Sequence, residues 1–199
     1  MAYAPMTEIE AINEMLMRSN LAPVNSLDSS GGVEVEKAKK ILEYTSRSVQ
    51  MRGWAFNTDK SLKLVPDTNN QIILPSNTLK VDAAGPDRHT MVTARDGILR
   101  KTNRYEGGDP TEFTSPIYVD IVYYLAFEEI PMTAQWYITV VAARRFSDAS
   151  TASSVLHQFQ QMEEARALVD LEEAEGEEAD FNMLDTMGPT LRRNMDNWG

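Results

Sequence analysis

The stretch MTAQWYITVVAARRF, residues 132–146, decides how this chain folds. Apart from the two arginines near its end, almost every residue in it is apolar or small. A helix that is apolar around its whole circumference must be covered on several sides. Pro131 suits the first position of such a helix, and Glu128 and Glu129 suit the positive end of its dipole. We therefore expect a central helix that other helices surround.

A last, long helix is expected over about residues 151–178. Its apolar residues fall in two adjacent rows, with Val155, Phe159 and Met162 in one and Leu156, Leu168 and Leu171 in the other. We expect Arg144 and Arg145 to end the central helix, where cations complement the C-terminal dipole, with a subunit contact as the alternative. Residues 126–178 are thus predicted to be helical, and residues 179–199, which show no periodicity, to form an extended tail.

Residues 1–53 are also predicted to be helical. Thr7 and Glu10 match a capping box, in which the two side chains satisfy backbone groups at a helix start. Asp28–Gly32 is expected to be a flexible connection, and Gly53 to stop the second helix. The apolar faces of the two helices are Ile9, Ile12, Met15 and Leu16 in the first and Val35, Ala38, Ile41, Leu42, Thr45 and Val49 in the second.

Residues 54–125 change to the pattern of short strands separated by turns, which predicts a small antiparallel β domain inserted between the helices. Asp96-Gly97 is a strong hairpin signal, because both positions tolerate the positive φ of a type I′ turn. The candidate strands are Ser61–Val65, Gln71–Leu74, Leu79–Ala83, Thr90–Ala94, Ile98–Lys101 and Ile117–Leu125. The last of them carries one charge among apolar and aromatic residues, so we expect it to be largely covered. The predicted fold class is α+β: a bundle of about four helices with an inserted small antiparallel β domain and an extended C-terminal tail.

Composition excludes several classes of protein. The 199 residues carry 19 basic and 30 acidic side chains, a formal net charge of −11, whereas a general nucleic-acid binder has a basic surface. Residues 163–199 alone hold eleven acidic and three basic side chains, a net of −8. The absence of cysteine removes disulfides and thiol chemistry. Without a signal peptide or a run of roughly 18 apolar residues, we expect a soluble protein of a reducing compartment.

The sequence contains no catalytic motif. His89 and His157 are its only histidines, and neither has a second ligand at helical spacing, so we expect surface or packing roles. The acidic run Glu172–Asp180 lacks the central glycine of a calcium loop, and we interpret it as a solvated helix end. There is also no phosphate-binding loop and no Gly-x-Ser-x-Gly elbow. We therefore expect no enzyme activity, no cofactor and no metal.

Two local features require a specific explanation. Residues 52–57, RGWAFN, join helix to sheet, and we expect Arg52, Gly53, Trp54 and Phe56 to form a structural junction in which the aromatic rings pin the sheet to the helices. The tail places large apolar residues where there is no core. We therefore expect it to order on a partner protein, through Phe181, Asn182, Met183, Leu184, Asp185 and Trp198.

With these features the chain resembles a known family, the tail tubular protein A, or head-to-tail adaptor, of short-tailed bacteriophages (podoviruses). The matching stretches are EIEAINEML, AKKIL leading to RGWAFN, the Ile130-Pro131 entry into YITVVAARRF, and FNMLD near the end. They occur in the family's order and span almost the whole chain, whereas residues 61–116 match only in their strand-rich character.

The resemblance implies a virion protein, assembled in the host cytoplasm, that forms a ring of about a dozen copies between the portal and the tail nozzle. It implies self-association and contacts with the portal, with tail tubular protein B of the nozzle and with a tail fibre. DNA would pass through the channel without specific binding, and no membrane contact is implied. Two alternatives stay open: a tail-associated polysaccharide or peptidoglycan hydrolase with carboxylates meeting across the β domain, and a small host regulator with an acidic tail.

Overall fold

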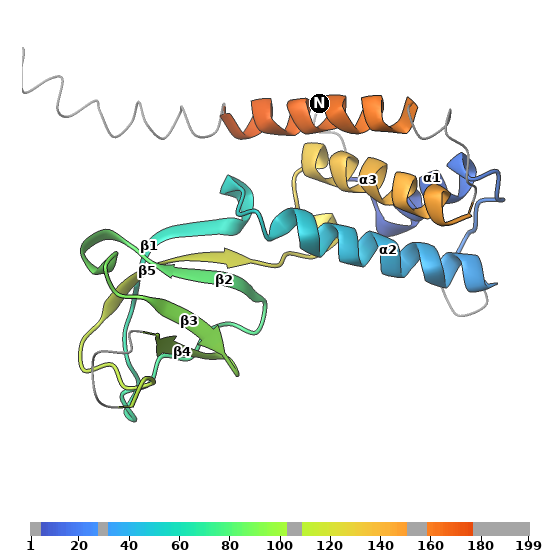
Figure 1. Ribbon diagram of the computed structural model, residues 1–199. Coiled ribbons are helices and arrows are strands. Elements are labelled where there is room, and N and C mark those ends of the chain that lie inside the picture. Colours follow the sequence, from blue (N-terminus) through green and yellow to red (C-terminus); the bar gives the residue numbers. More distant parts are fainter. Residues whose placement is uncertain (1–4, 28–31, 103–108, 151–158, 177–199) are drawn as a thin grey trace, which may run out of the picture. The chain divides into compact units, whose positions relative to one another are not determined.

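The computed structural model describes residues 5–27, 32–102, 109–150 and 159–176 (Figure 1). The chain divides into two compact units, one within Met1–Ser46 and Phe127–Gly199 and the other Arg47–Ala126. In the described residues the first unit is helical, whereas the second carries the β-sheets. The predicted α+β class is confirmed.

The helical unit contains α1 (Glu8–Arg18), most of α2 (Gly32–Gln50), the 3₁₀ helix η4 (Phe127–Glu129), α3 (Met132–Ser150) and a helix over residues 159–176. The capping box at the start of α1 is confirmed: the Glu10 amide donates to Thr7 Oγ1 at 3.4 Å, and the Thr7 amide donates to Glu10 Oε2 at 2.8 Å. Figure 1 shows α1 and α3 side by side.

Helix α3 is buried around nearly its whole circumference, as its sequence predicts. Its buried side chains are Ala134, Gln135, Tyr137, Ile138, Thr139, Val140, Val141, Ala142, Ala143, Phe146 and Ser147. The carbonyl of Pro131 accepts the first helical bond, from the Gln135 amide at 2.9 Å, so the helix begins one residue later than predicted. Gln135 lies fully buried, and its Nε2 donates to the Phe127 carbonyl at 2.7 Å, which ties η4 to α3.

Two predictions about the later helices are wrong. Helix α3 does not end at its arginine pair but continues to Ser150, and Arg144 pairs with the carboxylate of Glu164 on the next helix. Of the two apolar rows expected on that next helix, the first faces solvent at Phe159 and Met162, which are 68% and 57% exposed, whereas Leu171 of the second row is buried. The residues buried on it are Gln160, Ala167 and Leu171. Val155, Leu156 and His157 lie outside the described residues.

The second unit holds two antiparallel sheets. One has the order β1 (Thr58–Leu64), β5 (Ile117–Tyr123), β2 (Thr78–Ala83), and the other pairs β3 (Val92–Arg95) with β4 (Ile98–Lys101). The unit also holds the last turn of α2, from Arg47, and the 3₁₀ helices η2 (Ala55–Asn57) and η3 (Gly85–Asp87). Strand β5 is central and largely covered, as predicted. The core is formed by Ile72, Leu74, Val81, Leu99, Phe113, Ile117, Val119 and Ile121.

The turn between β3 and β4 confirms the hairpin signal, because Asp96 and Gly97 have φ of 55° and 72°. The predicted strand Gln71–Leu74 is wrong. It makes only the isolated bridge Ile73–Ile98, since Asn70 has a left-handed φ of 59° before it and Pro75 follows directly. Strand β1 begins earlier than predicted, at Thr58, and contains a bulge at Ser61, whose amide donates to Asp120 Oδ1 at 2.7 Å.

Strand β5 ends at Tyr123 rather than Leu125 because the next two amides have other acceptors. The Tyr124 amide donates to the Asn77 carbonyl at 2.7 Å, and the Leu125 amide donates to Gln50 Oε1 at 2.8 Å. Likewise α2 ends at Gln50, and Gly53 follows it in the left-handed region with φ 78°. Tertiary partners therefore set the end of β5, whereas a left-handed glycine follows the end of α2.

Candidate association surfaces

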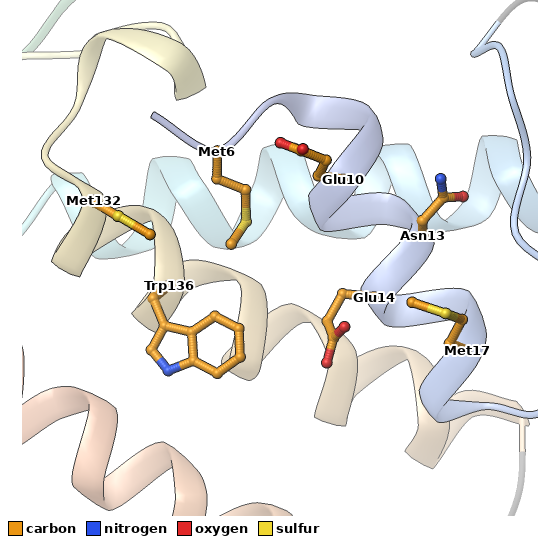
Figure 2. Close-up of a pocket in the computed structure, with 7 residues that line it drawn as sticks. All are labelled: Met6, Glu10, Asn13, Glu14, Met17, Met132 and Trp136. Carbon is orange, nitrogen blue, oxygen red and sulfur yellow. The ribbon is translucent and has the colours of Figure 1, made fainter. Parts of the chain in front are cut away.

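An open groove of about 420 Å³ lies between α1 and α3 (Figure 2). We call it the Met groove; it is lined by Met6, Glu10, Asn13, Glu14, Met17, Met132 and Trp136. Figure 2 shows Met132 and Trp136 projecting from α3 toward the side chains of Met6, Glu14 and Met17. Met17 and Met132 are 51% and 49% exposed, so the groove is open to solvent. Methionine adapts its shape to many partners, which makes such a surface suited to protein contact.

Polar contacts hold the walls of the Met groove in place. Arg18 Nε donates to Glu14 Oε1 at 2.7 Å, and the Arg18 guanidinium lies 5.6 Å from the centre of the Trp136 ring. Asn13 Nδ2 donates to the carbonyl of Val24 at 2.9 Å, and Asn13 Oδ1 accepts from the Val24 amide at 2.7 Å. Of the side chains that line the groove, Asn13, Glu14 and Trp136 are therefore held by contacts within the chain.

The rim of the Met groove carries negative charge. Hydrogen bonds from the backbone and the hydroxyl of Thr7 lower the pKa of the Glu10 carboxyl, which is therefore ionised at neutral pH. Glu14 supplies a second carboxylate beside Arg18. Burial lowers the pKa of Arg18, but its hydrogen bonds to Glu163 and Glu14 outweigh burial and raise it. The groove thus combines apolar walls with an acidic rim.

A second open apolar surface lies on the helix of residues 159–176. Phe159, Met162 and Val169 are 68%, 57% and 51% exposed, and Arg166 lies between them. At about 100° per residue these four positions share an arc of about 80°. We call this arc the outer stripe. The same helix buries Ala167 and Leu171 on another side. It therefore has two apolar faces, one packed against the helical unit and one open to solvent.

The predicted junction residues lie in the second unit. Trp54 is half-buried, its Nε1 donates to the Val49 carbonyl at 2.9 Å, and Arg52 lies 5.3 Å from the centre of its ring. Phe56 is half-buried. Two features require glycine at position 53. Its φ is positive, and a Cβ there would come within 3.1 Å of Val122 Cγ2 on β5.

The sequence interpretation missed Gln50 and Asn57, the two polar residues at this junction. Asn57 is 2% exposed; its Nδ2 donates to the carbonyls of Gln50 and Tyr123 at 2.9 and 2.8 Å, and its Oδ1 accepts from the Trp54 amide at 2.9 Å. Gln50 Nε2 donates to the Leu125 carbonyl at 3.0 Å, and Gln50 Oε1 accepts from the backbone amide of Leu125, so the two residues form a reciprocal pair of hydrogen bonds. The available signal was an asparagine that directly follows two aromatics between helix and strand.

The expected tail contacts fall outside the described residues. This applies to Phe181, Asn182, Met183, Leu184, Asp185 and Trp198. Of the histidines, His89 is exposed and accepts from Arg88 Nε at 3.4 Å. In the described part of the chain, no group of three or more His, Cys, Asp or Glu side chains could hold a metal.

The carboxylates of the β domain have structural partners. Asp82 and Asp120 are paired across β2 and β5, but each accepts from a backbone amide, Asp82 Oδ1 from Ala83 at 3.0 Å and Asp120 Oδ1 from Ser61. Asp67 accepts from the amides of Asn69 and Gln71, both at 2.8 Å, and so holds a turn. Glu128 and Glu129 are exposed on η4.

Open apolar surfaces on a helical unit are typical of proteins that work by binding other proteins. The comparison with family models agrees with this class. The model described as Tail tubular protein matches residues 9–181, and the chain belongs to this family. It is a structural protein of the phage tail and a component of the virion. A search of curated proteins finds no match, and no helix within the described ranges has the length and apolarity to cross a membrane.

Proposed function

We propose that this chain is the head-to-tail adaptor of a short-tailed phage. About a dozen copies form a ring that joins the portal to the nozzle formed by tail tubular protein B, and this ring encloses part of the channel through which DNA is ejected. The observation that carries the proposal is the family match over residues 9–181. Assembly takes place in the host cytoplasm before the virion is complete.

The two open surfaces of the helical unit support ring formation. A closed ring requires head-to-tail contacts, in which one surface of each copy meets a different surface of the next. The Met groove and the outer stripe are two such different surfaces. A protein that instead worked as a monomer would have no need to expose Phe159 and Met162 to water.

The charge of the chain supports a channel role. With a net charge of −11, of which −8 lies in residues 163–199, each chain as a whole repels the phosphates of DNA. A basic wall would bind phosphates strongly and slow passage. DNA therefore passes through the ring without specific binding.

Contacts with other tail components complete the proposal. The tail residues Phe181, Met183, Leu184 and Trp198 bind the portal or a neighbouring copy, and a tail fibre is a further partner. Apolar side chains beyond an acidic run would gain burial on such a partner, against the cost of ordering the segment. No observation on the described residues favours the hydrolase alternative.

The test mixes the purified chain with the portal protein at micromolar concentration. We expect a co-sedimenting complex and, in negative-stain images, rings bound to the portal; the chain alone and the portal alone serve as references. Met162→Glu should weaken ring formation, whereas Met91→Glu, at an exposed methionine of the second unit, is the matched control. If portal and wild-type chain do not co-sediment, the adaptor function is refuted.

A further inference from the structure

We infer that the Met groove of one copy receives the outer stripe of the next copy. The inference rests on the proposed ring and names the contact that closes it. Phe159, Met162 and Val169 supply the apolar side chains that enter the groove, and Arg166 faces its acidic rim. A helix laid into an apolar groove between two other helices is a common mode of recognition, with anchors at intervals of three and four residues.

The spacing of the two surfaces agrees. Along α1 the groove extends from Glu10 to Met17, and along the partner helix Met162 and Val169 are the same seven residues apart. Seven residues of helix rise about 10 Å. The spacing between Met162 and Val169 therefore equals the length of the groove along α1, and side chains of the stripe can occupy successive positions along the groove.

Charge supports the same contact and orients it. Arg166 is the cation within the stripe, and Glu10 and Glu14 are carboxylates on the groove rim. With the two helices antiparallel, Arg166 lies opposite Glu14 while Met162 lies beside Met17, and Val169 approaches Met132 at the other end of the groove. Opposite charges on the two surfaces favour a contact between the Met groove and the outer stripe. A contact between two outer stripes is disfavoured, because it would bring two Arg166 side chains together.

Because the chain contains no cysteine, engineered disulfides can test the contact without background. One variant carries Met17→Cys and another Met162→Cys; both residues are exposed, so the fold should persist, and thermal melting checks this. Mixing the two single variants should give a disulfide-linked dimer, and the double variant should give a ladder of higher multimers. Met132→Cys with Val169→Cys repeats the test at the other end of the groove. Met91→Cys with Met162→Cys is the control pair and should stay monomeric.

The outcomes separate this inference from the proposed function. A dimer of Met162→Cys alone would show stripe against stripe and overturn the inference, while rings bound to the portal would still uphold the adaptor. Arg166→Glu should weaken subunit association about three- to tenfold at low salt and less at high salt, whereas Arg166→Lys should nearly restore it. A benzophenone amino acid at position 17 identifies the occupant: cross-links to residues 159–169 of another copy are expected. Cross-links to the tail residues 179–199 or to the portal, or no ladder from either cysteine pair, would overturn the inference.

Discussion

The guanidinium of Arg18 donates to both oxygens of Glu163, 145 positions later in the chain, from Nη1 at 2.5 Å and from Nη2 at 2.8 Å. Its third nitrogen donates to Glu14, and its plane lies near the Trp136 ring. One side chain at the end of α1 therefore joins the helix of residues 159–176 to a wall of the Met groove. Both proposed association surfaces depend on this arginine for their relative placement.

Replacing Arg18 should destabilise the helical unit. Arg18→Ala leaves Glu14 and Glu163 without their partner, and we expect a loss of about 1–2 kcal/mol in the free energy of unfolding. The value is modest because the Glu163 side chain is 38% exposed and solvent screens the pair. Urea denaturation followed by circular dichroism measures it. Lys40→Ala, at an exposed position of α2, should change stability by less than about 0.5 kcal/mol; equal effects of the two variants would contradict the assigned role.

The buried amide of Asn57 should matter more than its neighbouring aromatics. Asn57→Ala removes three hydrogen bonds and leaves the carbonyls of Gln50 and Tyr123 without this donor. The Gln50 carbonyl still accepts from the Gly53 amide at 3.1 Å, so the groups that lose a partner are the Tyr123 carbonyl and the Trp54 amide. At about 1–3 kcal/mol for each buried polar group left unsatisfied, we expect a loss of about 3–4 kcal/mol. Chemical denaturation of the full chain gives the value. Asn69→Ala, an exposed asparagine in a turn, is the control, and a comparably small effect at Asn57 would refute the prediction.

Trp54→Ala should lower the free energy of unfolding by less than the truncation of a fully buried tryptophan would. A fully buried ring costs about 3–5 kcal/mol on truncation, but Trp54 is half-buried, so we expect about 2–3 kcal/mol. Trp54→Phe keeps an aromatic ring at this position but removes the bond to the Val49 carbonyl and part of the packed ring area, so it should lose about 1–2 kcal/mol. The two denaturation midpoints distinguish packing from hydrogen bonding. Identical losses in both variants would contradict a packing contribution from the aromatic ring that Trp54→Phe retains.

The capping box predicts a pH dependence. The pKa of Glu10 is lowered in the folded chain, so its contribution to stability is present above the ordinary carboxyl pKa and is lost as the pH falls through the lowered folded-state pKa. Glu10→Gln keeps an acceptor oxygen but does not titrate. Below about pH 4 the difference in melting temperature between wild type and Glu10→Gln should therefore shrink. A difference that stays constant from neutral to acidic pH would contradict this assignment.

Deleting residues 179–199 tests the tail. If Phe181, Met183, Leu184 and Trp198 bind the portal, the melting temperature stays unchanged and portal binding is lost. If the segment instead caps its own helical unit, the melting temperature falls. Thermal melting and co-sedimentation with the portal give the two readouts. A truncated chain that melts normally and still assembles into infectious particles would exclude both roles.

The sequence by itself determined the local structure of this protein. Periodicity and capping residues identified α1, α2 and α3, and Asp96-Gly97 identified the hairpin between β3 and β4. These features depend on backbone preferences and on neighbours a few residues away, which the order of amino acids states directly. The apolar circumference of α3 likewise required burial on several sides, wherever the covering helices came from.

Only the tertiary structure decided which apolar face is covered and where the elements end. Sequence periodicity marks two apolar rows on the helix of residues 159–176 without saying which is covered. In the fold the helix packs through Ala167 and Leu171, on the side where Arg18 and Arg144 pair with Glu163 and Glu164, and leaves Phe159 and Met162 exposed. Similarly, Asn57 and Gln50 form the junction because Tyr123 and Leu125 present unpaired backbone groups to them, 66 and 75 positions away. Partners so distant in the chain leave no local pattern, so the groove, the stripe and the junction become visible only when the chain is folded.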